Sequence, residues 1–133
     1  MSAYAEAWLT AFEWTLAIEM PLVVWLLRPV GLLWWHTAVL SAVVNALTHP
    51  TLWLAYRATY PDLDPRWLEP LIGDPYLRWI LVGESAVWFV EAVAFVTWLR
   101  LRVGPGHVPL AILAAVVANL ASTLFGLSGV THP

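Results

Sequence analysis

The residues of this sequence that are best suited to chemistry are carboxylates, amides and one histidine that interrupt long apolar stretches. Glu84 and Glu91 are seven residues apart, so on a helix they share one side and lie about 10 Å apart along its axis. Asn45, Thr48 and His49 stand at helical spacing in another apolar stretch. Ionisable groups within apolar helices are functional candidates by default, as proton relays or as ligands of a permeating cation.

Other polar residues extend this set to all of the apolar stretches. Counting inward from the predicted helix ends places Glu13, His49 and Glu84 at an outer depth, and Glu19 and Glu91 near the midplane. Four glutamates facing lipid as ions would cost roughly 10–14 kcal/mol, if each costs as much as an aspartate. We therefore expect all four to face the interior of the bundle or a wet cavity. The candidate residues for a polar interior or an ion-binding site are Glu19, Asn45, Thr48, His49, Glu84, Glu91, Asn119 and Ser122.

His49 and Glu84 fall at the same predicted depth, and a nitrogen ligand with an oxygen ligand suits zinc, manganese or iron. A divalent metal is therefore one hypothesis for this pair, and a structural or protonic hydrogen bond is the other. The sequence has no His-Glu-x-x-His motif, which would mark a zinc-dependent hydrolase. It also has no phosphate-binding loop or nucleophile motif, so it predicts no catalytic residue.

Four apolar stretches must position these side chains. The 133 residues are 61% hydrophobic and 11% charged, far from the usual soluble balance of about half apolar and a quarter charged. A helix that crosses a bilayer needs about 20 predominantly apolar residues. The predicted fold is all-α, a polytopic membrane protein of one domain (1–133) with four transmembrane helices as two antiparallel hairpins. The spans lie at about 7–27, 32–56, 77–99 and 108–130, and an acidic, proline-rich loop at 57–76 joins the hairpins.

Prolines, small residues and tryptophans add detail to these helices. Pro21 and Pro50 each lack a backbone N–H inside a span, so both are predicted to kink the helix. Small residues recur every four positions in the fourth span, a ridge that lets helices approach closely, at Ala114, Ala118, Ser122 and Gly126. The tryptophans expected at membrane interfaces are Trp34, Trp35, Trp53, Trp67, Trp79 and Trp98.

The two predicted hairpins show no convincing alignment with each other. The second span contains asparagine and histidine where the fourth contains asparagine and serine. The sequence alone therefore does not establish an inverted repeat of the kind that many transporters have.

Charge and cysteine content exclude several classes of function. The sequence has no lysine and six scattered arginines, so it lacks the basic patch that nucleic-acid binding requires. Without cysteine it forms no disulfide, thiolate metal site or iron–sulfur cluster. Arg28, Arg100 and Arg102 lie in short loops free of acids, which favours a cytoplasmic position for those loops and places both termini outside.

The order of the motifs resembles that of small, uncharacterised bacterial membrane proteins with four spans. The residues that support the resemblance cover most of the chain and are Glu19-x-Pro21, Asn45-x-x-Thr48-His49-Pro50, Glu84-x6-Glu91 and Asn119-x-x-Ser122. The resemblance implies a multi-pass protein of the bacterial inner membrane. It assigns no catalytic residue, because the family has no established activity.

Three functions follow from these observations. The first is a small ion, proton or metal transporter, expected to be a homo-oligomer because four helices enclose only a thin pathway. The second is a non-catalytic accessory subunit of a larger membrane complex, in which the polar layer would serve assembly. The third is a metal-dependent membrane enzyme, whose one candidate cofactor is a divalent metal at His49 and Glu84.

Overall fold

The computed structural model describes residues 3–130, and within this range the chain is all-helical. Short 3-10 turns connect the long helices, and a π-helical turn, Gly126–Val130, follows the last one. All four long helices are long and apolar enough to cross a membrane. Their bounds are α1 (Ala3–Leu26), α2 (Trp34–Thr59), α3 (Pro75–Val103) and α4 (Val108–Phe125).

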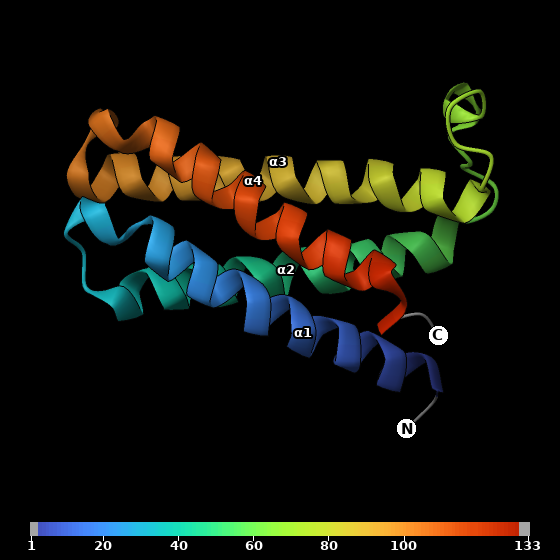
Figure 1. Ribbon diagram of the computed structural model, residues 1–133, viewed down its shortest axis with the longest axis horizontal. Coiled ribbons are helices and arrows are strands. Elements are labelled where there is room, and N and C mark those ends of the chain that lie inside the picture. Colours follow the sequence, from blue (N-terminus) through green and yellow to red (C-terminus); the bar gives the residue numbers. More distant parts are fainter. Residues whose placement is uncertain (1–2, 131–133) are drawn as a thin grey trace.

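Each long helix packs mainly against two neighbours. α1 and α3 both contact α2 and α4, so the four helices surround one interior. In Figure 1, the connections at 27–33 and 104–107 lie together at one end of the bundle, and both termini lie at the other end with the segment 60–74. α1 and α3 both run toward the end with the two connections, which we call the connection end, and α2 and α4 run back from it.

Local sequence sets several helix boundaries. Asp74 precedes α3, and its Oδ1 accepts hydrogen bonds from the backbone N–H groups of Tyr76 at 2.8 Å and Leu77 at 3.4 Å. These donors have no partner within the helix, so the carboxylate caps it. At the connection end, Gly104 has a φ of 94° and ends α3, a conformation that favours glycine. α1 and α2 continue through Pro21 and Pro50, and the kinks expected there stay a prediction.

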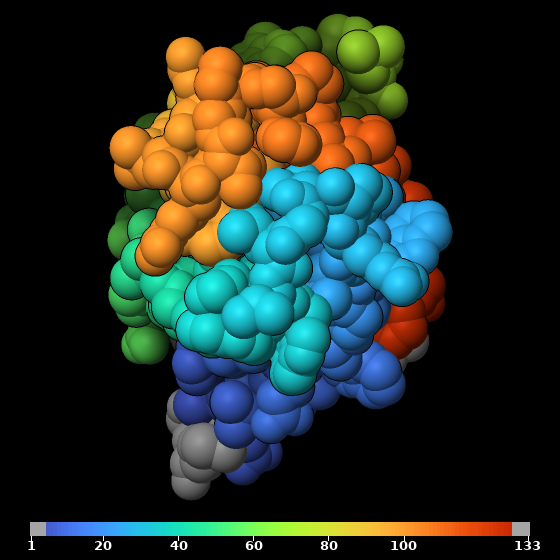
Figure 2. Space-filling model, turned by 90° about the vertical axis from the view of Figure 1, so that its left-hand side faces the viewer, coloured from blue at the N-terminus to red at the C-terminus, as the bar shows by residue number. Residues whose placement is uncertain are grey.

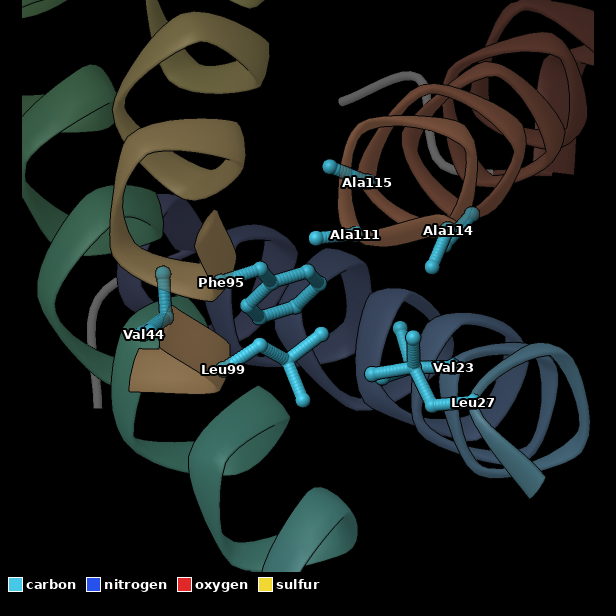
Figure 3. Close-up of a cluster of buried hydrophobic side chains, with 9 residues drawn as sticks. Val23, Leu27, Val44, Phe95, Leu99, Ala111, Ala114 and Ala115 are labelled. Atoms are coloured by element: carbon cyan, nitrogen blue, oxygen red, sulfur yellow. The ribbon is translucent and has the colours of Figure 1, made fainter. Parts of the chain in front are cut away.

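An apolar core fills the half of the bundle next to the connection end (Figure 3). Val23 and Leu27 of α1 and Phe95 and Leu99 of α3 are at most 1% exposed. The face of α4 that packs against them consists of small residues with no exposed surface: Ala111, Ala114, Ala115 and Ala118. Burial of Ala114 and Ala118 confirms the packing role predicted for them. Viewed from the connection end, side chains of both connections cover the surface (Figure 2).

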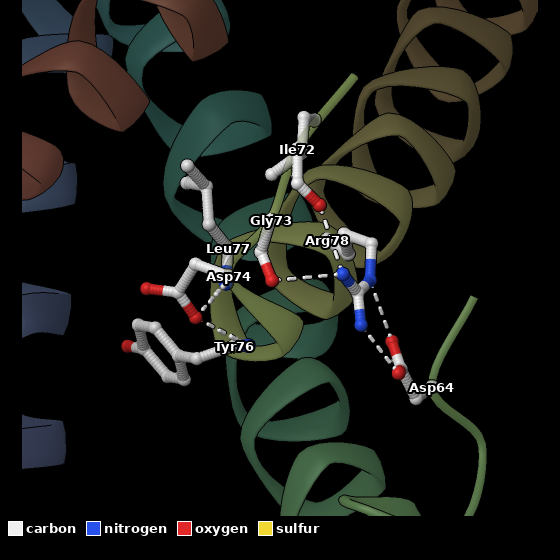
Figure 4. Close-up of polar contacts among 7 residues, drawn as sticks. All are labelled: Asp64, Ile72, Gly73, Asp74, Tyr76, Leu77 and Arg78. Atoms are coloured by element: carbon white, nitrogen blue, oxygen red, sulfur yellow. Dashed lines mark hydrogen bonds and ion pairs between the residues drawn. The ribbon is translucent and has the colours of Figure 1, made fainter. Parts of the chain in front are cut away.

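At the opposite end, the segment 60–74 is fastened to α3 by a buried arginine (Figure 4). Arg78 Nε and Nη2 donate to the carboxylate of Asp64 at 2.8 and 2.5 Å, and Nη1 donates to the backbone carbonyls of Ile72 and Gly73. The hydrogen bonds from Arg78 hold the pKa of the Asp64 carboxyl below its ordinary value. This clamp holds the segment 60–74 against α3 at the end of the bundle with the termini.

Candidate functional site

Glu19 of α1 lies in a buried polar network at the middle of the bundle. The Nδ2 of Asn45, on α2, donates a hydrogen bond to Glu19 Oε2 at 2.9 Å. The hydroxyl of Ser122, on α4, donates to Glu19 Oε1. The glutamate is 2% exposed, and each of its oxygens has a donor from a different helix. Its burial is therefore matched by hydrogen bonds, as burial of a polar group requires.

Glu91 of α3 has the corresponding arrangement. The Nδ2 of Asn119, on α4, donates to Glu91 Oε2 at 2.6 Å, and the hydroxyl of Thr48, on α2, donates to Oε1 at 2.9 Å. Both asparagine amides also donate to the carbonyl four residues earlier in their own helices, at Ser41 and Ala115. All donors of the two amides are thus engaged, and both glutamates accept two hydrogen bonds from other helices.

The two halves of this network repeat one pattern. Each glutamate receives an amide from the next helix along the chain and a hydroxyl from a helix of the other pair. The repeating residues, 72 positions apart on the first helix of each pair and 74 on the second, are Glu19 with Glu91, Asn45 with Asn119, and Thr48 with Ser122. The sequence alone showed no convincing alignment of the two helix pairs. Their matched residues share chemistry rather than identity, which hid the repeat in the sequence.

The repeat extends into the apolar core. Val23 corresponds to Phe95 and Leu27 to Leu99 at the same separation of 72 residues, and all four side chains are buried. The first helices of both pairs run in the same direction (Figure 1). The two pairs are therefore related by an approximate two-fold axis along the length of the bundle, which is the parallel type of repeat.

The repeat is broken at one level of the bundle, next to the network on the side of the termini. At the same separations, Phe12 corresponds to Glu84, and His49 corresponds to Thr123. The rings of Phe12 and His49 lie 5.4 Å apart in the first pair, while Thr123 Oγ1 donates to Glu84 Oε2 at 3.3 Å in the second. The corresponding side chains contact each other in both pairs, but their chemical types differ. This level of the bundle therefore holds one carboxylate and one imidazole.

A cavity of about 200 Å³ reaches from the network toward the end with the termini. Its lining stops at Glu19 on α1 and starts at Asn119 on α4, so it occupies the half of the bundle opposite the apolar core. Glu84 and His49 both line it. Glu84 accepts one hydrogen bond from another helix, and His49 Nδ1 is buried without a hydrogen-bond partner among the described residues. Glu84 thus accepts fewer hydrogen bonds from other helices than Glu19 or Glu91 does.

Seven of the eight residues predicted for the polar interior line this cavity, and Glu91 is the exception. Glu91 lies behind the cavity wall, where it is 1% exposed. Ser122 of α4 bonds to Glu19 of the central network, a contact that is possible because helical side chains point back toward the N-terminus of their helix.

Glu13 was expected to face the interior or a wet cavity, and this was wrong because its side chain is exposed and does not line the cavity. Six residues separate it from Glu19, which turns it about 120° around the helix at 3.6 residues per turn. Phe12, seven residues before Glu19, instead lies on the interior side and contacts His49.

Aromatic residues form the outer walls of the cavity, a role that the sequence analysis missed. They are Trp14, Trp53, Tyr56, Tyr76, Trp79 and Phe125. Trp53 and Trp79 were expected at membrane interfaces, but Trp79 is only 8% exposed. The sequence could have shown this role for two of them. Trp53 and Tyr56 follow His49 by four and seven residues and so continue its face of α2.

The geometry gives little support to a resident metal. No group of three or more histidine, aspartate, glutamate or cysteine side chains in the described part of the chain is arranged to hold an ion. His49 and Glu84 alone supply two ligands, whereas structural zinc sites use four and catalytic zinc sites three from the protein. The arrangement is better suited to a ligand that needs two acceptors.

No family model, curated protein or solved structure matches the chain.

Proposed function

We propose that the chain is a small multi-pass membrane protein that binds a cation in its cavity as one step of transport. In this proposal the helices cross the bilayer as two antiparallel hairpins, α1 with α2 and α3 with α4. Their length and apolar composition support insertion. Burial of glutamate, asparagine and histidine within such helices supports a role in a solute pathway, because intramembrane ionisable groups are expensive to maintain.

The observation that carries the proposal is the unequal hydrogen bonding of the carboxylates. Glu19 and Glu91 each accept two hydrogen bonds from other helices, which explains them as interhelical structure. Glu84 accepts one such bond, from Thr123, and lines the same cavity as His49, whose Nδ1 has no hydrogen-bond partner among the described residues. A carboxylate with spare acceptor capacity in a cavity with apolar walls attracts a cation.

Access from one side favours a transporter over an open channel. The cavity reaches the end with the termini, and the apolar core of Val23, Leu27, Phe95 and Leu99 fills the other half of the bundle. A transporter exposes its site to one side at a time around a site near the midplane. The cavity is lined by all four helices of one chain, so a second copy is not needed to complete it.

Current measurements on reconstituted protein test this proposal. Proteoliposomes adsorbed to a solid-supported membrane are exposed to jumps in proton, Mn²⁺ and n-butylammonium concentration. We expect charge movement with at least one of these cations for the wild type, its loss in Glu84→Gln, and its retention in Glu13→Gln. The second variant removes a carboxylate from the exposed face of α1 and so serves as the matched control. Absence of charge movement with every cation would refute transport and favour the accessory-subunit hypothesis.

A further inference from the structure

We propose that the cation is a small primary alkylammonium ion, with its nitrogen between Glu84 and His49 and its alkyl chain against the aromatic wall. This inference rests on the proposed function and names the class of ligand for the same cavity.

The two unsatisfied groups match the hydrogen-bonding needs of an ammonium. A primary ammonium has three N–H donors and no acceptor. Glu84 supplies a carboxylate with spare acceptor capacity, and a neutral His49 supplies a ring nitrogen as a second acceptor. A charge-assisted bond to the carboxylate is the stronger of the two. A divalent metal would need further ligands, and no group of three or more histidine, aspartate, glutamate or cysteine side chains among the described residues is arranged to hold an ion.

The walls next to these groups suit an organic cation rather than a hydrated ion. Trp53, Tyr56 and Trp79 line the cavity with apolar ring surface, and aromatic faces attract cations within about 6 Å. The rings are held in place, since the centroids of Tyr56 and Trp79 lie 5.1 Å apart at 74°, and Trp79 Nε1 donates to Thr59 at 3.2 Å. Rigid aromatic walls stabilise an alkyl chain that a metal ion does not have.

The volume limits the ligand to a few heavy atoms. A cavity of about 200 Å³ has the volume of six or seven waters at about 30 Å³ each. It is smaller than the roughly 300–1,000 Å³ of pockets for drug-sized ligands. A chain of about four carbons with a terminal ammonium fits this limit, and n-butylammonium is therefore the probe of choice.

The broken repeat separates this site from the structural network. Positions that hold the helices together are equivalent in both pairs, as Glu19 and Glu91 show. At the level of the proposed site the pairs differ, because Phe12 stands where the second pair has Glu84 and Thr123 stands where the first has His49. A packing role alone would not need one acidic and one basic group at a level that is otherwise matched, whereas a single asymmetric ligand would.

Calorimetric titration of the full-length protein in detergent at neutral pH tests the inference with three probes. They are n-butylammonium, its neutral analogue butan-1-ol, and tetramethylammonium, which is a cation without N–H donors. We expect n-butylammonium to bind and butan-1-ol not to bind, and we expect tetramethylammonium to bind about tenfold more weakly. Glu84→Gln should weaken n-butylammonium binding by about tenfold or more. His49→Phe, which keeps a ring at this position, should weaken it several-fold, and Glu13→Gln should leave it unchanged.

Equal binding of butan-1-ol, or full affinity in Glu84→Gln, would overturn the ammonium site. If n-butylammonium does not bind but protons or Mn²⁺ give currents that require Glu84, this inference fails and the proposed function stands. If no cation binds and none gives a current, both fail. Circular dichroism of each variant shows that a loss of binding does not come from a loss of the fold.

Discussion

Replacing Asn45 or Asn119 with leucine should destabilise the bundle to nearly the same extent. Each change removes the donor to one oxygen of a buried glutamate, at 2.9 Å for Glu19 and 2.6 Å for Glu91, while keeping the size of the side chain. A hydrogen bond to a charged group contributes about 1.5–3 kcal/mol, and interhelical bonds within membranes average about 0.6 kcal/mol. Each glutamate keeps only one donor from another helix, so we expect a loss of about 2 kcal/mol per variant, or roughly thirtyfold in the unfolding equilibrium.

Unfolding by sodium dodecyl sulfate in mixed micelles, followed by tryptophan fluorescence, measures this loss. Thr51→Val is the control, because Thr51 is exposed and its hydroxyl donates to the Leu47 carbonyl of its own helix. This control should change stability by less than about 0.5 kcal/mol. The reasoning is refuted if both asparagine variants match the control. A large loss in one with none in the other would contradict the structural equivalence of the two helix pairs.

Three further predictions concern the clamp, the apolar core and one close helix contact. In Asp64→Asn the segment 60–74 should exchange its amide hydrogens faster, as measured by mass spectrometry. The pKa of Asp64 is lowered in the folded protein. The wild-type clamp is therefore fully present above the ordinary carboxyl pKa and is lost as the pH falls through the lowered value. Amide protection of the segment that does not change across that range would contradict the clamp. Phe95→Ala should let protons leak across vesicles that contain the protein, because Phe95 is fully buried in the core between the cavity and the connection end. A proton leak no faster than that of wild-type vesicles would contradict a barrier there. Gly83→Ala should weaken n-butylammonium binding, because a Cβ there would lie 2.6 Å from Leu52 Cδ1 and push that lining side chain inward. Gly73→Ala should have no effect on binding, because Gly73 has open space around it.

The helices and much of the buried polar face could be predicted from the sequence because both depend on local periodicity. Thr37, Ser41, Asn45 and Thr48 recur at helical spacing along one stripe of α2, and all four are buried. The predicted span 32–56 differs from α2 by two or three residues at each end. Twenty apolar residues and a helical repeat need no tertiary information, so such features are visible in a single sequence.

The partners of the polar groups could not be predicted, because they depend on how helices distant in the sequence meet. Ser122 donates to Glu19, which lies more than one hundred residues earlier, and no local pattern indicates that contact. The unequal hydrogen bonding of Glu84 and Glu91 is also invisible in their shared spacing. The internal repeat lies between these cases. Its two separations, 72 and 74 residues, are present in the sequence, but they became recognisable only when the contacts showed which residues play the same part.

The most direct test of the central claim is the accessibility of single cysteines, which the absence of natural cysteine makes simple. Thr15→Cys places a thiol on the cavity wall, and Val23→Cys places one in the apolar core. Sealed vesicles are treated on either side with a charged, impermeant thiol reagent, and a protease-sensitive terminal tag identifies the side of the termini. The account predicts that the thiol at position 15 reacts only from the side of the termini and that the thiol at position 23 reacts from neither side. Reaction at position 23, or reaction at position 15 only from the opposite side, would contradict a polar cavity closed by an apolar core.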